Sequence, residues 1–216
     1  MALEPRSKGA QAHHGRSSIE AMTQPASNSV LSVPARAGTL VGGFVALLYA
    51  IEVVDTVLSD RLDSHGVRPR SDEGLLGIVF APLLHGGWAH LVANTIPLLV
   101  LGFLLALSGV RTWVSVTAIV WVVGGLGVWL FGGSNTVHIG ASGLVFGWLV
   151  HLMVRGIFAR SLRQLALGLV VFAVYGSVLW GVIPGRPGIS WEGHLFGALG
   201  GALAAWLLAP RGDETA

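Results

Sequence analysis

The sequence predicts an all-α membrane protein, a bundle of six transmembrane helices with a membrane-embedded first loop. Three observations predict it: 53% of the 216 residues are apolar, only 11% are charged, and six apolar stretches are each long enough to cross a bilayer. A soluble domain carries about 25% charged residues, so the composition excludes an ordinary soluble protein. Transmembrane strands are excluded because no stretch alternates with period two over about ten residues.

The six stretches are each close to the length of about 20 residues that spans the hydrocarbon core as a helix. They cover Thr39–Leu58, Leu91–Ser108, Thr112–Phe131, Gly140–Phe158, Leu162–Ile183 and Trp191–Ala209. Residues 39–209 therefore form the predicted membrane core. Residues 1–38 and 210–216 are polar, and we expect a disordered tail and a short tail there. The sequence leaves open whether the chain starts at Met1 or Met22.

The segment between the first two stretches has a different composition. Ser59–Glu73 is charged, whereas Gly74–Trp88 is apolar but interrupted by Pro82 and by glycines. This apolar part is too short to cross a membrane. We expect it to lie in the membrane interface or to re-enter the bilayer.

The positive charges predict the orientation, because loops rich in Lys and Arg stay in the cytoplasm. With the N-terminus inside, nine of the thirteen fall on the inner face and four, namely Arg61, Arg68, Arg70 and Arg186, on the outer face. Both termini are therefore predicted to be cytoplasmic. Twelve Arg against one Lys hints at a GC-rich bacterial genome, and hence at the plasma (inner) membrane of a bacterium.

Few charges and no run of Lys or Arg argue against nucleic acid as a partner. The absence of cysteine excludes disulfides, thiolate metal ligands and a cysteine nucleophile. The histidines are too scattered along the chain to predict a metal site, so no cofactor or metal is expected.

Polar residues inside apolar helices are candidates for a functional site. In the predicted topology the second, fourth and sixth helices all begin at the outer face, and each carries hydrogen-bonding groups near that end. These groups are His85, His90 and Asn94 at the second helix, Ser142 at the fourth and His194 at the sixth. The coincidence in depth indicates one shared site.

Small residues predict how two of these helices meet. Gly193, Gly197 and Gly201 recur every four residues, and Gly143 and Gly147 form a matching pair beside Ser142. Such stripes allow close backbone approach. Packing them together would bring Ser142 and His194 to hydrogen-bond distance.

Serine and histidine are the minimum for nucleophilic acyl transfer, with the imidazole as general base. His90, Asn94 and the backbone N–H of Ser142 could stabilise the oxyanion. No carboxylate is placed to orient His194, since Glu192 points elsewhere on its helix. Simpler interpretations exist: a serine in an apolar helix usually bonds its own i−4 carbonyl, and glycine stripes by themselves indicate only packing.

Three motifs resemble those of the rhomboid family of intramembrane serine proteases. They are His85-Gly86-Gly87-Trp88-Ala89-His90 followed by Asn94, Gly140-Ala141-Ser142-Gly143, and Gly193-His194 followed by Gly197 and Gly201. The resemblance implies a six-span rhomboid-like bundle and a Ser142–His194 dyad without an acidic third member. It implies an oxyanion site of His90, Asn94 and the Ser142 N–H, supported by His85, Gly140, Gly143, Phe146, Gly197 and Gly201. Phe146 stands where the family often has Tyr, and its ring can still stack on His194.

The resemblance also implies the reaction: an endopeptidase that cleaves transmembrane segments of membrane proteins near the outer face, with the lipid bilayer and those segments as its partners. The fifth span and Pro184–Ser190 would be its lateral gate and cap. A catalytically silent rhomboid-like module that binds client transmembrane helices remains an alternative. A transporter or channel is disfavoured, because the sequence has no internal repeat and no midplane charges.

Other polar residues have plainer interpretations. We expect His138 to face mostly solvent, with lining the entrance of the site as the alternative, and His151 to pack in the core. Glu52 and Asp55 should snorkel or cap the first loop. The sequence does not identify the natural substrate, the cleavage site, the oligomeric state, the gating motion or the role of the N-terminal tail.

Overall fold

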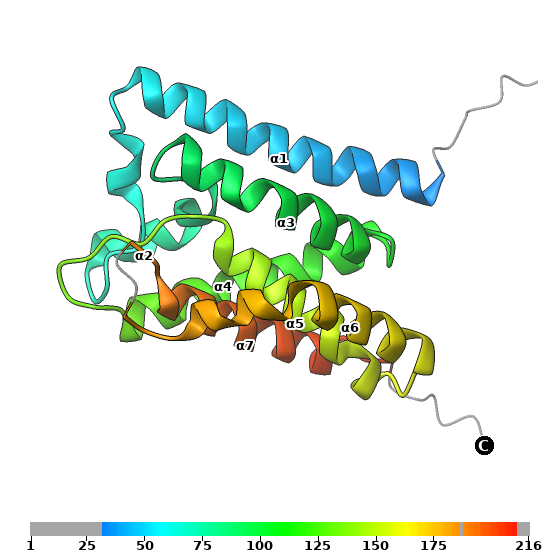
Figure 1. Cartoon of the computed structure of the whole chain (residues 1–216). Helices are drawn as coiled ribbons and strands as arrows, with labels where there is room; N and C mark the ends of the chain where they lie inside the picture. The colour runs from blue at the N-terminus through cyan, green and yellow to red at the C-terminus, as the bar shows by residue number, and fades with distance from the viewer. Residues whose placement is uncertain (1–31, 186–187, 211–216) are drawn as a thin grey trace, which may run out of the picture. The chain divides into compact units, whose positions relative to one another are not determined.

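Seven α-helices and three short 3₁₀ helices build residues 32–185 and 188–210, the part of the chain that this computed structural model describes (Figure 1). In chain order they are α1 (Val33–Val57), η2 (Leu62–His65), α2 (Asp72–Phe80), η3 (Ala81–Leu83), α3 (Trp88–Ala106), α4 (Val110–Phe131), α5 (Ser142–Phe158), α6 (Leu162–Tyr175), η4 (Gly176–Val182) and α7 (Trp191–Leu207). The described residues contain no strand, only an isolated antiparallel bridge between Val67 and His138. The all-helical prediction is therefore confirmed for this part of the chain.

The first helix begins earlier than the hydropathy predicts. α1 starts at Val33 instead of Thr39, because Pro34 occupies the first turn, where its missing N–H costs no hydrogen bond. Ala37 is already buried. Residues 33–38 therefore belong to the helix, which corrects the end of the predicted tail. Residues 1–31 and 211–216, which hold the rest of both predicted tails, lie outside the described residues.

Four helical segments are at least 18 residues long and apolar enough to cross a membrane, within the described ranges: α1, α3, α4 and the 21 residues Leu162–Val182 formed by α6 and η4. They indicate a multi-pass membrane protein. The remaining two predicted spans are shorter, since α5 and α7 each have 17 residues. Length and hydropathy therefore support four of the six predicted spans.

The fifth predicted span is not one continuous α-helix. α6 ends at Tyr175, and the chain continues as the 3₁₀ helix η4 to Val182. Gly176 and Gly181 both lie in this stretch, and glycine has a low helix propensity. The tighter 3₁₀ turn places the backbone of Gly181 against the functional site described below.

α5 lies at the centre of the helix packing. It packs most extensively against α7 and also contacts α3, α4 and α6, while α1 packs against α3 (Figure 1). Trp148 of α5 is fully buried in the main apolar core, which also holds Leu98 and Leu101 of α3. The indole N–H of Trp148 donates to Thr117 of α4, so the one polar atom of this ring is satisfied. Core packing thus fixes α5, which begins at Ser142.

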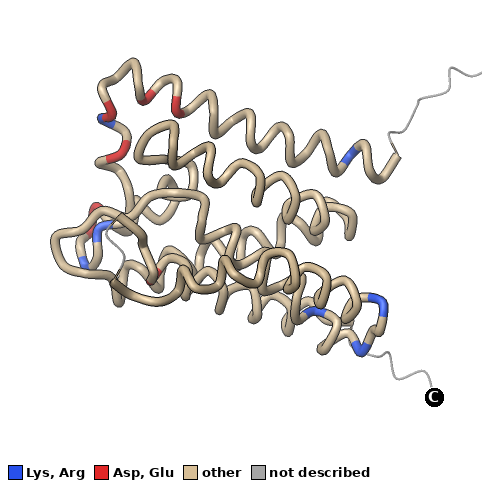
Figure 2. The backbone as a smooth tube through the Cα atoms, in the orientation of Figure 1, with Lys and Arg blue, Asp and Glu red and all other residues tan. Residues whose placement is uncertain are grey.

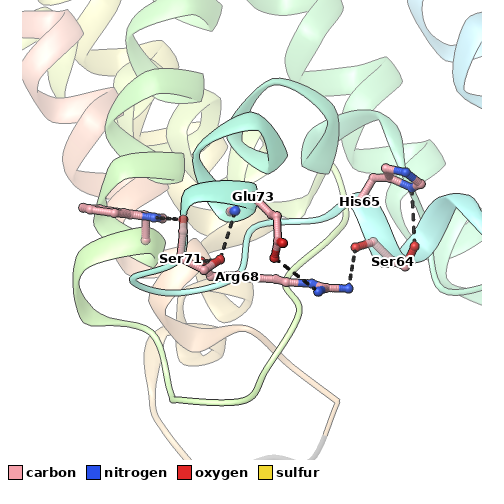
Figure 3. Close-up of polar contacts among 7 residues, drawn as sticks. Ser64, His65, Arg68, Ser71 and Glu73 are labelled. Carbon is pink, nitrogen blue, oxygen red and sulfur yellow. Dashed lines mark hydrogen bonds and ion pairs between the residues drawn. The ribbon is translucent and has the colours of Figure 1, made fainter.

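The segment between α1 and α3 forms short helices and no span, as the sequence predicts. Ser71 caps α2 by accepting from the Gly74 N–H, and Arg68 reaches both the carboxylate of Glu73 and the carbonyl of Ser64 (Figure 3). Beyond the exposed Asp72 and Glu73 of its first turn, the exposed side of α2 is apolar, with Leu75, Leu76, Val79 and Phe80. Asp and Glu gather at this end of the bundle, whereas Lys and Arg lie at both ends (Figure 2).

Candidate active site

Ser142 and His194 lie in hydrogen-bond contact, as the glycine stripes predict. Ser142 is the first residue of α5, His194 is in the first turn of α7, and 2.9 Å separates Ser142 Oγ from His194 Nε2. The other ring nitrogen, Nδ1, lies 2.9 Å from the carbonyl oxygen of Gly181. A carbonyl can only accept, so Nδ1 carries the proton of the neutral ring and Nε2 accepts from the Ser142 hydroxyl.

Glycine-to-backbone contacts between α5 and α7 bring the two side chains together. A Cβ on Gly197 would collide with the carbonyl of Gly143, and one on Gly201 would collide with the carbonyl of Gly147. A Cβ on Gly143 would lie 3.2 Å from the carbonyl of Gly193. The two helices therefore approach at a distance that only glycine allows, which confirms the packing predicted for these stripes.

Phe146, one turn after Ser142, fixes the plane of the imidazole. Its ring stacks on His194 with centroids 4.0 Å apart and an angle of 8° between the planes. Phe146 is buried, so the stack has little room to reorient. The hydrogen bond to Gly181 and this stack together define both the position and the tautomer of His194.

The pair opens onto a cavity of about 610 Å³. Its walls come from the start of α3, the segment before α5 and the residues around the start of α7. They include His90, Asn94, Ser142 and His194, so these four residues line one cavity; His138 and Ser190 also line it. A cavity of this size can hold a short peptide segment beside the serine.

His90 presents a donor toward the loop before Ser142. The backbone N–H of Gly86 donates to His90 Nδ1 at 3.3 Å, so the proton of the neutral ring is on Nε2. A Cβ on Gly140 would lie 2.8 Å from this Nε2, and Gly140 also has φ of +115°, so two constraints require glycine there. This positive φ also explains why α5 begins at Ser142 and not at the predicted Gly140.

Asn94 and His85 complete the wall formed by α3 and the residues before it. The Asn94 amide donates to the carbonyl of His90 at 3.1 Å, which leaves its second N–H free of that bond. His85 is buried, and its Nε2 accepts from the Ala141 N–H at 3.4 Å, next to Ser142. Burial, with a contribution from His90, lowers the pKa of His85 to about 4, so this ring is neutral at physiological pH.

Gly181 and Ser190 are not predicted as site residues, and His138 is placed differently from the prediction. Gly181 supplies the carbonyl that His194 contacts, and nothing in the sequence marks a backbone oxygen. His138 is not mostly solvated, because its ring lies between Thr136 and Ser190, 2.7 Å from each hydroxyl oxygen. The signal that could have found Ser190 is its position as N-cap just before the last apolar stretch.

The remaining polar residues lie elsewhere. His151 is buried deeper in α5, as predicted. Asp55 accepts from the Leu62 N–H at 2.7 Å, so it caps the first loop, while Glu52 is buried near it and does not snorkel. Within the residues that the structure describes, no cluster of three acidic or histidine side chains could hold a metal ion.

Comparison with known proteins relates the chain to one family. A model described as the Rhomboid domain matches residues 72–211. An uncharacterized protein of Mycobacterium tuberculosis strain H37Rv is 54% identical over 180 residues, which is 80% of this chain and 75% of the relative. An uncharacterized protein of Mycobacterium leprae is 51% identical over 189 residues, 82% of this chain and 75% of the relative.

A more distant relative carries a functional name. "Putative rhomboid protease YdcA" of Bacillus subtilis is 28% identical over 138 residues, which is 61% of this chain and 66% of the relative. No solved structure matches the chain significantly.

Proposed function

This chain belongs to the rhomboid family, and on that premise we propose that it is an intramembrane serine endopeptidase that cleaves transmembrane segments of membrane proteins. The observation that carries the proposal is the 2.9 Å contact between Ser142 Oγ and His194 Nε2 at the wall of a cavity. A serine that donates to a histidine fixed in one tautomer has the arrangement of an activated nucleophile.

The proposed reaction has two halves. Ser142 Oγ attacks the scissile carbonyl carbon while His194 Nε2 takes the hydroxyl proton, and the tetrahedral intermediate collapses when Nε2 returns that proton to the leaving amine. Water then attacks the acyl-enzyme and gives its proton to Nε2. When the bond to Ser142 Oγ breaks, Nε2 passes that proton to Oγ, and the product carboxyl group and free Ser142 result. The positive charge on His194 during each half is met by the Gly181 carbonyl at Nδ1.

Three donors are assigned to the oxyanion: His90 Nε2–H, the second N–H of Asn94 and the backbone N–H of Ser142. The Ser142 N–H has no intrahelical acceptor, because it is in the first turn of α5. Removing one oxyanion donor typically lowers kcat by about 100-fold to 1000-fold. We expect Asn94→Ala to fall near the lower end, since His90 and the backbone donor remain.

We further propose that α1, α3, α4, α5, α6 with η4, and α7 are six spans with both termini in the cytoplasm. The 17 residues of α5 and α7 reach about 25 Å at 1.5 Å per residue, close to the hydrocarbon thickness. Ser142 and His194 then lie near the outer face. The apolar exposed side of α2 fits the membrane interface there.

The test is labelling by a fluorophosphonate probe on purified protein in detergent. We expect the wild type to be labelled and Ser142→Ala and His194→Ala to be unlabelled, with the melting temperature showing that all three are folded. His65→Ala, on the exposed η2, is the matched histidine control and should label like the wild type. A folded wild type without labelling would overturn the proposal and favour the client-binding module.

A further inference from the structure

A second serine–histidine contact lies beside the proposed dyad, at the same cavity. His138 Nδ1 is 2.7 Å from Ser190 Oγ, and both residues line the cavity with Ser142 and His194. Each partner stands four residues before a member of the dyad: His138 before Ser142, and Ser190 before His194. This contact therefore joins the segment that leads into α5 to the residue that leads into α7.

The neighbouring hydrogen bonds determine which group donates. The Thr136 hydroxyl donates to the carbonyl of Gly133 at 2.6 Å, so toward His138 Nε2, 2.7 Å away, Thr136 can only accept. Nε2 of His138 therefore carries the proton. Nδ1 is unprotonated and accepts from the Ser190 hydroxyl. Both nitrogens of neutral His138 are satisfied in this arrangement, and burial lowers the pKa of the ring, opposed by Glu192.

Ser190 holds the first turn of α7 through two atoms. Its Oγ accepts from the Gly193 N–H at 3.1 Å, and its carbonyl accepts from the His194 N–H at 3.1 Å. The Ser190 Oγ therefore accepts one hydrogen bond from the helix backbone and donates one to His138. The direction of the Ser190 side chain, and with it the first turn that carries His194, is set by the position of His138.

The backbone of His138 is itself fixed. Its N–H and carbonyl exchange two hydrogen bonds with Val67, at 3.0 Å and 2.9 Å, and Val67 is buried. The segment after η2 therefore anchors His138, and His138 anchors Ser190. Three stretches that are far apart in the sequence therefore meet at this one residue, Val67 at its backbone and Ser190 at its ring.

We propose that His138 is a positioning residue that aligns Ser142 with His194 through the Ser190 cap. This inference rests on the proposed protease function and adds a residue to it. His138 does not contact the reacting atoms; it keeps the two helix starts in the relative position that the 2.9 Å contact of the dyad requires. Small displacements in such a contact lower the rate strongly, by as much as about 100-fold for 1 Å.

The test compares the rate constant for fluorophosphonate labelling with the melting temperature in a double-mutant cycle. We expect His138→Ala and Ser190→Ala each to slow labelling about tenfold, and the double variant to be no slower than either single one. Such non-additivity is the signature of two residues that act through one contact. Ser190→Thr keeps a hydroxyl that can cap and donate, so it should restore most of the rate.

His65→Ala is the matched control. It removes an exposed imidazole of η2 that bonds only within its own turn, so its labelling rate should stay near that of the wild type. With a transmembrane substrate, the loss in His138→Ala should appear mainly in kcat, because His138 acts on the alignment of the dyad and does not contact the reacting atoms.

Three results would overturn the inference: a folded His138→Ala that labels at the wild-type rate, losses that multiply in the double variant, or a fall in melting temperature with no change in rate. Failure of the protease proposal is distinct, because then the wild type itself is not labelled.

Discussion

The imidazole of His194 donates from Nδ1 to the carbonyl oxygen of Gly181, 2.9 Å away. In serine hydrolases with a triad, a carboxylate occupies this position and holds the histidine in the reactive tautomer. Here a backbone carbonyl of η4 makes the same contact with a partial charge only. Because η4 continues α6, the orientation of His194 depends on where the end of α6 lies.

A methyl group at position 181 should therefore disturb the proposed dyad. A Cβ there would lie 2.7 Å from Phe146 Cζ and 3.0 Å from His194 Nδ1, so Gly181→Ala must shift the ring, its stacking partner or η4. We expect labelling to slow about tenfold or more. Gly176→Ala is the control on the same 3₁₀ helix, since the atoms nearest its Cβ belong to the half-exposed ring of Phe172, which can move. Equal labelling of both variants would contradict this role of Gly181.

We expect Phe146 to raise the reaction rate through the stacking of its ring on His194. Aromatic stacking is worth about 0.5–1.5 kcal/mol, which corresponds to about a threefold to tenfold change in rate. Phe146→Leu keeps an apolar side chain but loses the stack, so its kcat should fall by about that factor. Phe146→Tyr keeps the ring and should retain most of the activity. If the leucine variant has the same kcat as the wild type, the parallel stack with His194 is not needed for turnover.

The sequence predicts well those features that depend on residue type and period. The apolar stretches give the helices, and the four-residue glycine repeats give the contact between α5 and α7 and hence the meeting of Ser142 and His194. Both follow from local sequence patterns and do not depend on how the rest of the chain is placed.

Features that depend on tertiary placement are not predictable in this way. The Gly181 carbonyl has no side chain to signal it, and α6 changes to a 3₁₀ helix within an unbroken apolar stretch. From the sequence, His138 is an ordinary loop histidine. Its contacts are with Val67 and Ser190, both more than 50 residues away, which bond its backbone and its ring.

The glycine contact between α5 and α7 should be essential for both stability and labelling. In Gly197→Ala the new Cβ meets the backbone carbonyl of Gly143, which cannot rotate away, so the helices must separate. We expect a loss of about 1–3 kcal/mol in the free energy of unfolding, together with slower labelling.

Gly42→Ala on α1 is the control, because no atom lies within 4 Å of its Cβ. It should gain up to about 1 kcal/mol from helix propensity. A Gly197→Ala variant as stable and as reactive as the wild type would be incompatible with this contact.

The carboxyl group of Asp63 in η2 should make stability depend on pH. Burial, then the charge of Asp55 and a hydrogen bond with it, raises the pKa of Asp63 from 3.8 to about 6. The folded state therefore favours the protonated form, and this group destabilises the fold increasingly as pH rises from about 4 to 6 and fully above that.

Asp63→Asn imitates the neutral form, so at pH 7.5 it should melt at a higher temperature than the wild type, and the difference should shrink toward zero near pH 4. Histidines that titrate in the same range act equally in both proteins and cancel in the difference. A difference in melting temperature that stays constant with pH would mean that Asp63 is ionised with an ordinary pKa in the fold.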